Sequence, residues 1–264
     1  MASAAILIPN SPSEIREAYR ANRIPTLAPR LILLARLILA LIVQALLAVL
    51  LLLLGHANPW QEAAGWWMVY GTLIDLGCFA LLIWLTRKEG IRPRDLLNAQ
   101  RERILRDVLL GIVYFIALIP AVVVSSVITN IVYGAQLPPQ VAVVHLPVWA
   151  AIYSVVVWPI FWALAEELTY LGYAFPRLEF QAGKTWLVAF IVAFFWAFQH
   201  IAMPLIFDWT YLVYRVVTAF LVVATTAVLY LLGKRRILPL VIAHWGADGL
   251  SAFLASMVPL LPRA

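Results

Sequence analysis

Charged side chains are scarce in this sequence of 264 residues. Asp, Glu, Lys and Arg make up 12% of it, whereas hydrophobic residues make up 64%. Because soluble domains carry about 25% charged residues, the composition excludes an ordinary soluble protein and predicts a polytopic membrane protein. No polar stretch between the apolar segments is long enough to hold a core of its own, so we expect one membrane domain over residues 30–264.

Cysteine is almost absent as well. Cys78 is the single cysteine, and it lies in an apolar segment. A lone cysteine excludes an intrachain disulfide and a zinc site built from several cysteines. The net charge of +6 does not indicate nucleic-acid binding, because the basic residues cluster at the ends of apolar segments. We therefore expect the lipid bilayer as a partner, and no nucleic acid.

Long apolar segments are abundant. Seven of them approach the length of about 20 residues that crosses the hydrocarbon core of a bilayer. The fold class that follows is all-α, a polytopic transmembrane helical bundle with about seven spans. The predicted spans are 31–54, 63–86, 108–133, 148–176, 185–203, 211–232 and 238–257.

Nearly all lysine and arginine residues fall on one side of this arrangement. If residues 1–29 form a cytoplasmic N-terminal tail, the inner loops are basic, whereas the outer loops at 55–63 and 134–146 carry no Lys or Arg. Basic loops remain in the cytoplasm, so we predict a cytoplasmic N-terminus. The basic segment 86–107 is either an amphipathic helix on the inner membrane surface or a solvated loop that sets the topology.

A few ionisable residues stand inside the predicted spans. In hydrocarbon each needs a partner in the bundle interior, so each is a candidate functional residue. Most of them lie in the last four spans, and for Asp75, which does not, a buried structural role is the favoured interpretation. The set is Asp75, Glu166, Glu167, His200, Arg215, His244 and Asp248.

The late spans bring acids and imidazoles together in one part of the bundle. A desolvated carboxylate can act as a general base, and an imidazole can orient a water molecule or return a proton. A second imidazole can stabilise an oxyanion. This set of groups can hydrolyse an amide. Glu166, His200 and His244 would also make a plausible zinc site with an open water position.

Three short patterns in these spans resemble the motifs of a protein family. They are two adjacent glutamates, an aromatic residue four positions before His200, and a histidine four positions before Asp248. The CAAX-processing and bacteriocin-processing intramembrane proteases carry Glu-Glu-x-x-x-Arg, Phe-x-x-x-His and His-x-x-x-Asn/Asp in this order. The resemblance covers residues 147–257. That family includes the type II prenyl-protein endopeptidases, which remove the last three residues of a prenylated protein.

The resemblance implies a role for each motif residue. Glu166 would be the base that activates water, with His200 as its partner. His244 and Asp248 would line the oxyanion side, and Glu167 would be the supporting acid. The family favours a metal-free glutamate mechanism, so no cofactor is expected.

The resemblance also implies a substrate and a location. We expect a peptide or a prenylated, membrane-anchored protein as substrate, with Trp196 and Tyr170 as substrate-binding residues. We expect the site to open toward the cytoplasmic side, in a bacterial plasma membrane.

One position departs from the motif. Leu171 stands where the family has Arg, so Glu167 lacks a cation four residues on. We hypothesise either that Arg215 replaces this cation as a supporting residue or that Glu167 stays protonated. The departure leaves a second function open, a catalytically inactive relative that acts in binding or bacteriocin immunity. A small transporter is a third alternative, but the halves of the chain lack the inverted symmetry typical of transporters.

Overall fold

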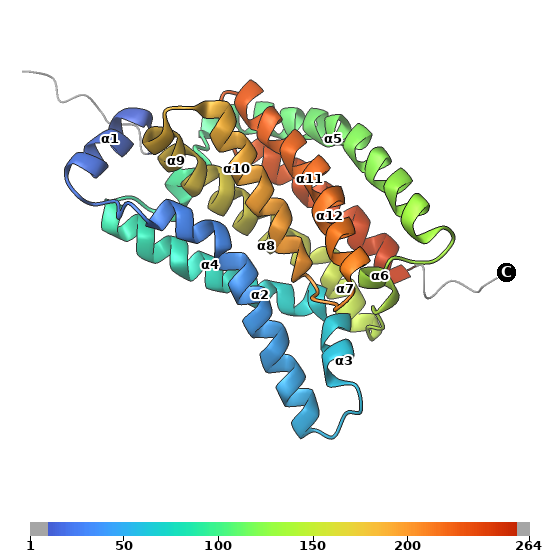
Figure 1. Cartoon of the computed structure of the whole chain (residues 1–264). Helices are drawn as coiled ribbons and strands as arrows, with labels where there is room; N and C mark the ends of the chain where they lie inside the picture. Colours follow the sequence, from blue (N-terminus) through green and yellow to red (C-terminus); the bar gives the residue numbers. More distant parts are fainter. Residues whose placement is uncertain (1–9, 258–264) are drawn as a thin grey trace, which may run out of the picture.

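The structure is a computed structural model that describes residues 10–257. Within them the chain forms a bundle of helices without a β-strand (Figure 1). The helices are α1 (Pro12–Arg20), α2 (Ala28–Leu53), α3 (Pro59–Gly65), α4 (Trp67–Glu89), η1 (Pro93–Leu97), η2 (Arg101–Arg103), α5 (Ile104–Tyr133), α6 (Pro139–Ala142), α7 (Val148–Val156), α8 (Trp158–Glu167), η3 (Leu168–Ala174), α9 (Phe175–Ala182), α10 (Thr185–Phe198), η4 (Gln199–Ile201), α11 (Trp209–Leu232) and α12 (Leu238–Met257).

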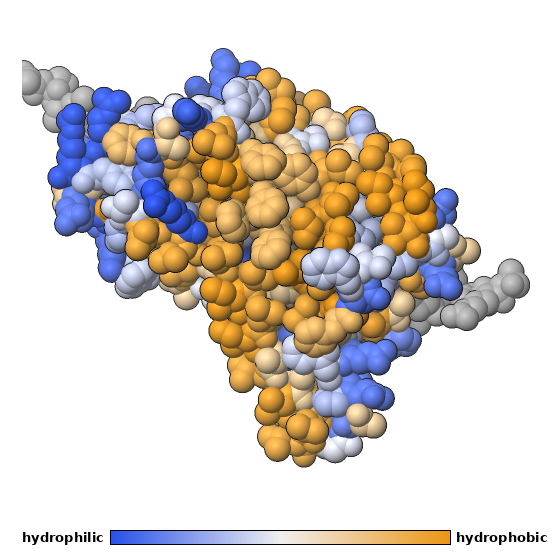
Figure 2. Space-filling view, in the orientation of Figure 1, coloured by the Kyte–Doolittle hydropathy of each residue, from blue (hydrophilic) through white to orange (hydrophobic). Residues whose placement is uncertain are grey.

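Six helical runs in the described part of the chain are long and apolar enough to cross a membrane. A shorter apolar run, Thr185–Ile201, accompanies them. Figure 2 shows apolar side chains over the middle of the visible face, with hydrophilic side chains gathered toward its edges. The predicted polytopic helical bundle is therefore confirmed, and the protein is an integral membrane protein. The six runs are Ala28–Leu53, Trp67–Glu89, Pro93–Tyr133, Val148–Ala182, Trp209–Leu232 and Leu238–Ser256.

The run that carries the two glutamates changes its helical geometry along its length. Pro159 lies in the first turn of α8, where a missing backbone N–H is tolerated. A π-helix, η3, follows directly on Glu167, and π-helical turns are frequent at functional sites. A Cβ atom on Gly172 of η3 would lie 3.2 Å from side-chain atoms of Ile237 and Leu96. Glycine thus lets η3 pack closely between two other segments.

The basic segment 86–107 does not form one amphipathic helix. Gly90 ends α4 in a left-handed conformation with φ 82°, which glycine adopts without a steric penalty. Pro93 begins η1, and Asn98 ends it with φ 49°. Leu96 is fully buried. The helix alternative for this segment is therefore wrong, because these backbone turns interrupt it.

Part of the predicted N-terminal tail packs onto the bundle. Helix α1 contacts α9. The side-chain amide of Asn10 donates to the carbonyl of Gly172 at 3.0 Å, and Arg177 donates to Asn10 Oδ1 at 2.9 Å. The ends of the predicted tail and membrane domain, residues 1–9 and 258–264, lie outside the described residues.

Helix α8 lies between the early and the late helices. It packs against α4, α7 and α12, while α2 packs against α4, α10 and η3. In Figure 1 α2 and α4 run along one side of the bundle and α5 along the other, and the lower half of α2 projects with α3 away from it. Side chains from both ends of the chain can therefore meet at the end of α8.

Cysteine labelling tests the predicted orientation. In a Cys78→Ala background, a membrane-impermeant maleimide added to intact cells should label Gln136→Cys and leave Arg94→Cys unlabelled. Both positions are exposed: Arg94 lies in η1, before α5, and Gln136 lies in the loop that follows α5. Permeabilised cells, in which both should react, are the control. The reverse pattern in intact cells would show that the N-terminus lies outside.

Candidate active site

The carboxylate of Glu166 is fully buried at the end of α8 and is held from several directions. Its Oε2 accepts a hydrogen bond from Trp196 Nε1, and its Oε1 accepts one from Gln199 Nε2 at 2.7 Å. Arg36 Nη2 lies 3.3 Å from Oε1, and His244 Nε2 lies 3.7 Å from Oε2. Groups from α2, α10, η4 and α12 thus fix this single carboxylate.

The ring of His244 connects the two glutamates to Asp248. Its Nδ1 lies 3.3 Å from Glu167 Oε1. Its Nε2 lies 3.2 Å from Asp248 Oδ2, on the side that also faces Glu166. Both ring nitrogens therefore face carboxylate oxygens, which fixes the plane of the ring. The predicted acids and this imidazole form one cluster.

His200 is oriented by the backbone. Its Nδ1 lies 3.0 Å from the carbonyl oxygen of Trp196 and 3.2 Å from that of Ala197. A carbonyl can only accept, so we assign the proton to Nδ1, which leaves a lone pair on Nε2. No hydrogen bond or ion pair joins His200 to Glu166 within residues 10–257. They meet instead as lining residues of one cavity.

This cavity has a volume of about 260 Å³ and is lined by the candidate catalytic side chains other than Glu167. Glu166, His200, His244 and Asp248 line it together with Trp196, and the rest of the wall comes from α5, α11 and α12. It gives a substrate and a water molecule a common place beside the acids and the imidazoles. All of these residues were predicted to belong to the site.

The cavity extends away from the basic loops. From Glu166 it reaches Thr129 near the end of α5, Tyr214 near the beginning of α11 and Ser251 in the second half of α12. With a cytoplasmic N-terminus, these helix ends face the outer side. The expected opening toward the cytoplasmic side is therefore not the direction in which this cavity runs.

An aromatic cavity adjoins the first one. It has a volume of about 480 Å³ and shares His200 and Arg215 with the smaller cavity. Trp67, Trp158 and Trp162 line its other side, and their rings pack in edge and tilted contacts with centroids 5.0–6.1 Å apart. Apolar and aromatic surface thus lies directly beside the polar cluster.

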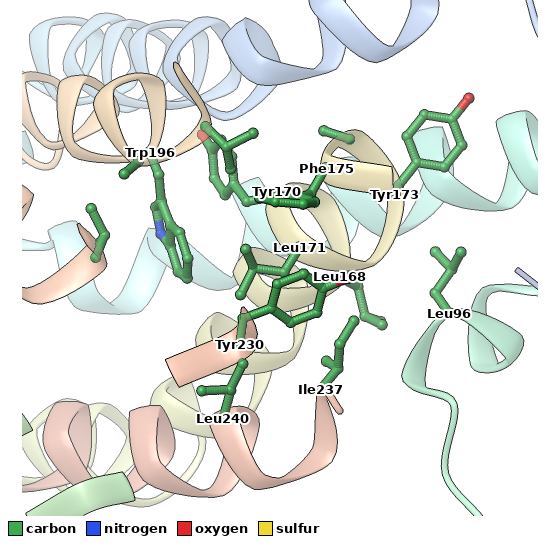
Figure 3. Close-up of a cluster of buried hydrophobic side chains, with 14 of the residues drawn as sticks. Leu96, Leu168, Tyr170, Leu171, Tyr173, Phe175, Trp196, Tyr230, Ile237 and Leu240 are labelled. Carbon is green, nitrogen blue, oxygen red and sulfur yellow. The ribbon is translucent and has the colours of Figure 1, made fainter. Parts of the chain in front are cut away.

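Leu171 occupies an apolar cluster instead of supplying a cation. Figure 3 shows its side chain near Leu168, Tyr230 and Leu240, and it is fully buried. Glu167 Oε2 is also buried and has no hydrogen-bond partner within residues 10–257. An unpartnered buried oxygen is costly when it is charged, which favours the hypothesis of a protonated Glu167.

Arg215 does not replace the missing arginine. It donates to the backbone carbonyls of Met203 at 3.0 Å and of His200 at 3.4 Å. Among the described residues it forms no ion pair with Glu167. The substitution hypothesis is wrong because the side chain is held by the chain segment that follows His200, and it supports that segment instead.

Tyr170 also differs from its predicted role. Its ring stacks on Trp196 with centroids 5.2 Å apart, and it is fully buried (Figure 3). Its hydroxyl donates to Gln199 Oε1 at 3.1 Å. It lines neither of the two cavities next to the site. Tyr170 thus contacts the residues that hold Glu166, whereas Trp196 does line the cavity.

Arg36 and Gln199 belong to the polar cluster but were not predicted to belong to the site, and Asp75 was expected to have a buried structural role. Arg36 Nη1 lies 2.6 Å from Asp75 Oδ1, and Arg36 Nε donates to Gln199 Oε1 at 2.9 Å. Arg36 was not among the ionisable residues singled out inside the predicted spans. Its position about 12 Å into α2, eight residues after Ala28, was a signal that it needs a buried partner.

The arrangement of Glu166, His200 and His244 does not favour the alternative of a zinc site. Within the described residues, no three His, Cys, Asp or Glu side chains are placed to hold one metal ion. Both carboxylate oxygens of Glu166 already accept hydrogen bonds, from Trp196 and from Gln199. As arranged, these described side chains do not form a zinc site.

Comparison with known families agrees with the motifs. Residues 144–250 match the model of a family described as type II CAAX prenyl endopeptidase Rce1-like. The match contains the glutamates and both histidines of the cavity, so the resemblance is confirmed for this part of the chain. It does not include Arg36 or Asp75. No curated protein and no solved structure matches the chain significantly.

The hydrogen bond from Trp196 to Glu166 can be tested with a matched pair of variants. Trp158 is buried like Trp196, but its Nε1 has no hydrogen-bond partner within residues 10–257. A hydrogen bond to a charged group contributes about 1.5–3 kcal/mol. We therefore expect Trp196→Phe to lower the free energy of unfolding by about 1.5–3 kcal/mol more than Trp158→Phe does. Unfolding of both variants in detergent micelles measures this difference. Equal losses would contradict the bond.

Proposed function

Starting from the family match of residues 144–250, we propose that the protein is an intramembrane endopeptidase in which Glu166 activates water. The observation that carries the proposal is the cavity of about 260 Å³ that Glu166 shares with His200 and His244. A buried carboxylate is an effective general base when it lies within reach of the water that it deprotonates.

The proposed reaction begins with a water molecule between Glu166 and His200. Glu166 accepts one proton of the water, and the lone pair on His200 Nε2 accepts a hydrogen bond from the other hydrogen. The water oxygen bonds to the carbonyl carbon of the substrate amide and forms a tetrahedral oxyanion. Glu166 then donates its proton to the amide nitrogen, and the carbon–nitrogen bond breaks.

His244 has the proposed role of stabilising the oxyanion. Glu167 lies on its Nδ1 side, which leaves Nε2 directed toward Glu166 and Asp248. As an N–H donor, Nε2 can stabilise the negative charge that develops on the substrate oxygen. An ionised Asp248 would repel that charge, so in this mechanism Asp248 is protonated or orients the ring.

The proposed substrate is a membrane-associated peptide or protein, including a prenylated one. The matched family points to this class, and the cavity of about 480 Å³ offers the indole rings of Trp67, Trp158 and Trp162 beside His200. Burial of a prenyl chain or an apolar side chain there is favourable by about 25 cal/mol per Å². We also propose the bacterial plasma membrane as the location.

A cleavage assay with matched glutamate variants tests the proposal. Purified protein is given a quenched farnesyl peptide and a panel of unprenylated peptides. We expect Glu166→Gln to lower kcat by about 10²–10⁴-fold, because it removes the general base. Glu179→Gln is the control, since Glu179 pairs with Arg235 away from the cavity, and it should keep the wild-type kcat. Unchanged turnover in Glu166→Gln would refute the assigned base.

The same assay distinguishes a metal-free protease from a metal-dependent one and from an inactive binding or immunity protein. Turnover that is indifferent to a chelator supports the metal-free mechanism, whereas its loss with chelator and return with zinc would assign a metal enzyme. Absence of turnover on every peptide, from folded protein, would favour the inactive binding or immunity protein. Two observations favour this second function: Leu171 replaces the motif arginine, and Glu167 Oε2 has no hydrogen-bond partner among residues 10–257.

A further inference from the structure

Arg36 lies at the junction of three helices and contacts the catalytic candidate directly. Its Nη1 is 2.6 Å from Asp75 Oδ1 on α4, and its Nη2 is 3.3 Å from Glu166 Oε1 on α8. Its Nε donates to Gln199 Oε1, and its guanidinium lies over the ring of Trp162 at 4.5 Å. The side chain is fully buried.

The two carboxylates use different nitrogens of the same guanidinium. A buried arginine is stable only when its charge is paired and its donors are used, and its planar fork gives each partner a fixed direction. Asp75 makes the shorter contact and so anchors the side chain, whereas Glu166 makes the longer one. Glu166 therefore receives positional restraint from Arg36 without being its principal counterion.

Arg36 also acts on Glu166 through Gln199. The Oε1 atom of Gln199 accepts hydrogen bonds from Arg36 Nε and from the Tyr170 hydroxyl. Two donors on the oxygen side determine which way the amide points. Its Nε2 then faces Glu166 Oε1 at 2.7 Å. The orientation of this donor thus depends on Arg36.

No other lysine or arginine within residues 10–257 forms an ion pair with either motif glutamate. Arg215 is bonded to backbone carbonyls, and Arg177 pairs with Glu89. Leu171 leaves the motif without its own cation. Arg36 is therefore the basic residue that supplies one, from a helix outside the family match.

We propose that Arg36, anchored by Asp75, is a positioning residue that fixes the Glu166 carboxylate both directly and through Gln199. The inference rests on the proposed role of Glu166 as the base. In this proposal α2 and α4 contribute Arg36 and Asp75 to the active site, although the family match begins only at residue 144.

The test removes the whole ion pair. Arg36→Met alone leaves two buried carboxylates unpaired and is expected to fold poorly, so the informative variant is Arg36→Met/Asp75→Leu. We expect kcat to fall about 100-fold, as for a displaced catalytic group, while KM changes less than about threefold. A wild-type kcat in this folded variant would overturn the proposal.

The control is the same exchange at a second ion pair. Asp107 and Arg236 join α5 to the segment before α12, and neither lines the cavity beside Glu166. Arg236→Met/Asp107→Leu should therefore keep kcat within about threefold of wild type. An equal fall in both double variants would show a general loss of structure and would overturn a specific role for Arg36.

Arg36→Lys separates charge from geometry. A lysine restores the charge but lacks the planar fork that reaches Asp75, Gln199 and Glu166 together. We expect a partial recovery, with kcat about tenfold below wild type. Full recovery would show that the fork does not position Glu166 and would overturn the proposal, whereas no recovery over the double variant would assign the whole effect to the geometry of the fork.

A thermal-unfolding cycle tests the contact without using activity. It compares wild type, Arg36→Lys, Glu166→Gln and the combined variant. If Arg36 contacts Glu166, the change in Tm of the combined variant should differ by more than about 2 °C from the sum of the changes in Tm of the two single variants. Additive shifts would overturn the proposal. If wild type cleaves no peptide, the proposed function fails, and this cycle still decides whether Arg36 holds Glu166.

Discussion

The structure depends on the stabilisation of one carboxylate in an apolar interior. A charge buried without partners is strongly unfavourable in a protein, and more so at membrane depth. Glu166 obtains its partners from Trp196 and Gln199 beside it and from Arg36 on a helix far earlier in the chain. These contacts join α2, α8, α10 and η4. The packing of the late helices against the early ones is therefore also the condition under which the Glu166 carboxylate can be buried with partners.

The sequence predicted what depends on local pattern. Hydrophobic length and charge asymmetry predicted the helical spans, because crossing a bilayer requires about 20 apolar residues whatever the tertiary packing. The motif spacing predicted that Glu166, His200, His244 and Asp248 meet, and they line one cavity. Breaks within the spans were not predicted. The π-helix η3 follows Glu167 and packs against the distant residues Leu96 and Ile237, and no local propensity encodes such contacts.

Residue partnerships were the least predictable part of the site. Arg215 was paired with Glu167 because it is a cation in a late span, but its guanidinium is held by the backbone after His200. Tyr170 was assigned to substrate because it lies near the glutamates, yet its side chain packs behind Trp196. Partner choice depends on how helices rotate about their axes. That rotation follows from the packing of the whole bundle, so a pattern on a single helix does not determine it.

The order of the charged residues along the chain has a consequence for membrane insertion. Helices α2 and α4 are synthesised before α8, and they carry Arg36 and Asp75. A basic and an acidic side chain that pair within the first two spanning helices offset the cost that each would have alone in hydrocarbon. If this pair forms as the first two spanning helices insert, a paired cation is in place to receive Glu166 when α8 enters. The early helical hairpin can thus act as an internal template for inserting the acidic helix.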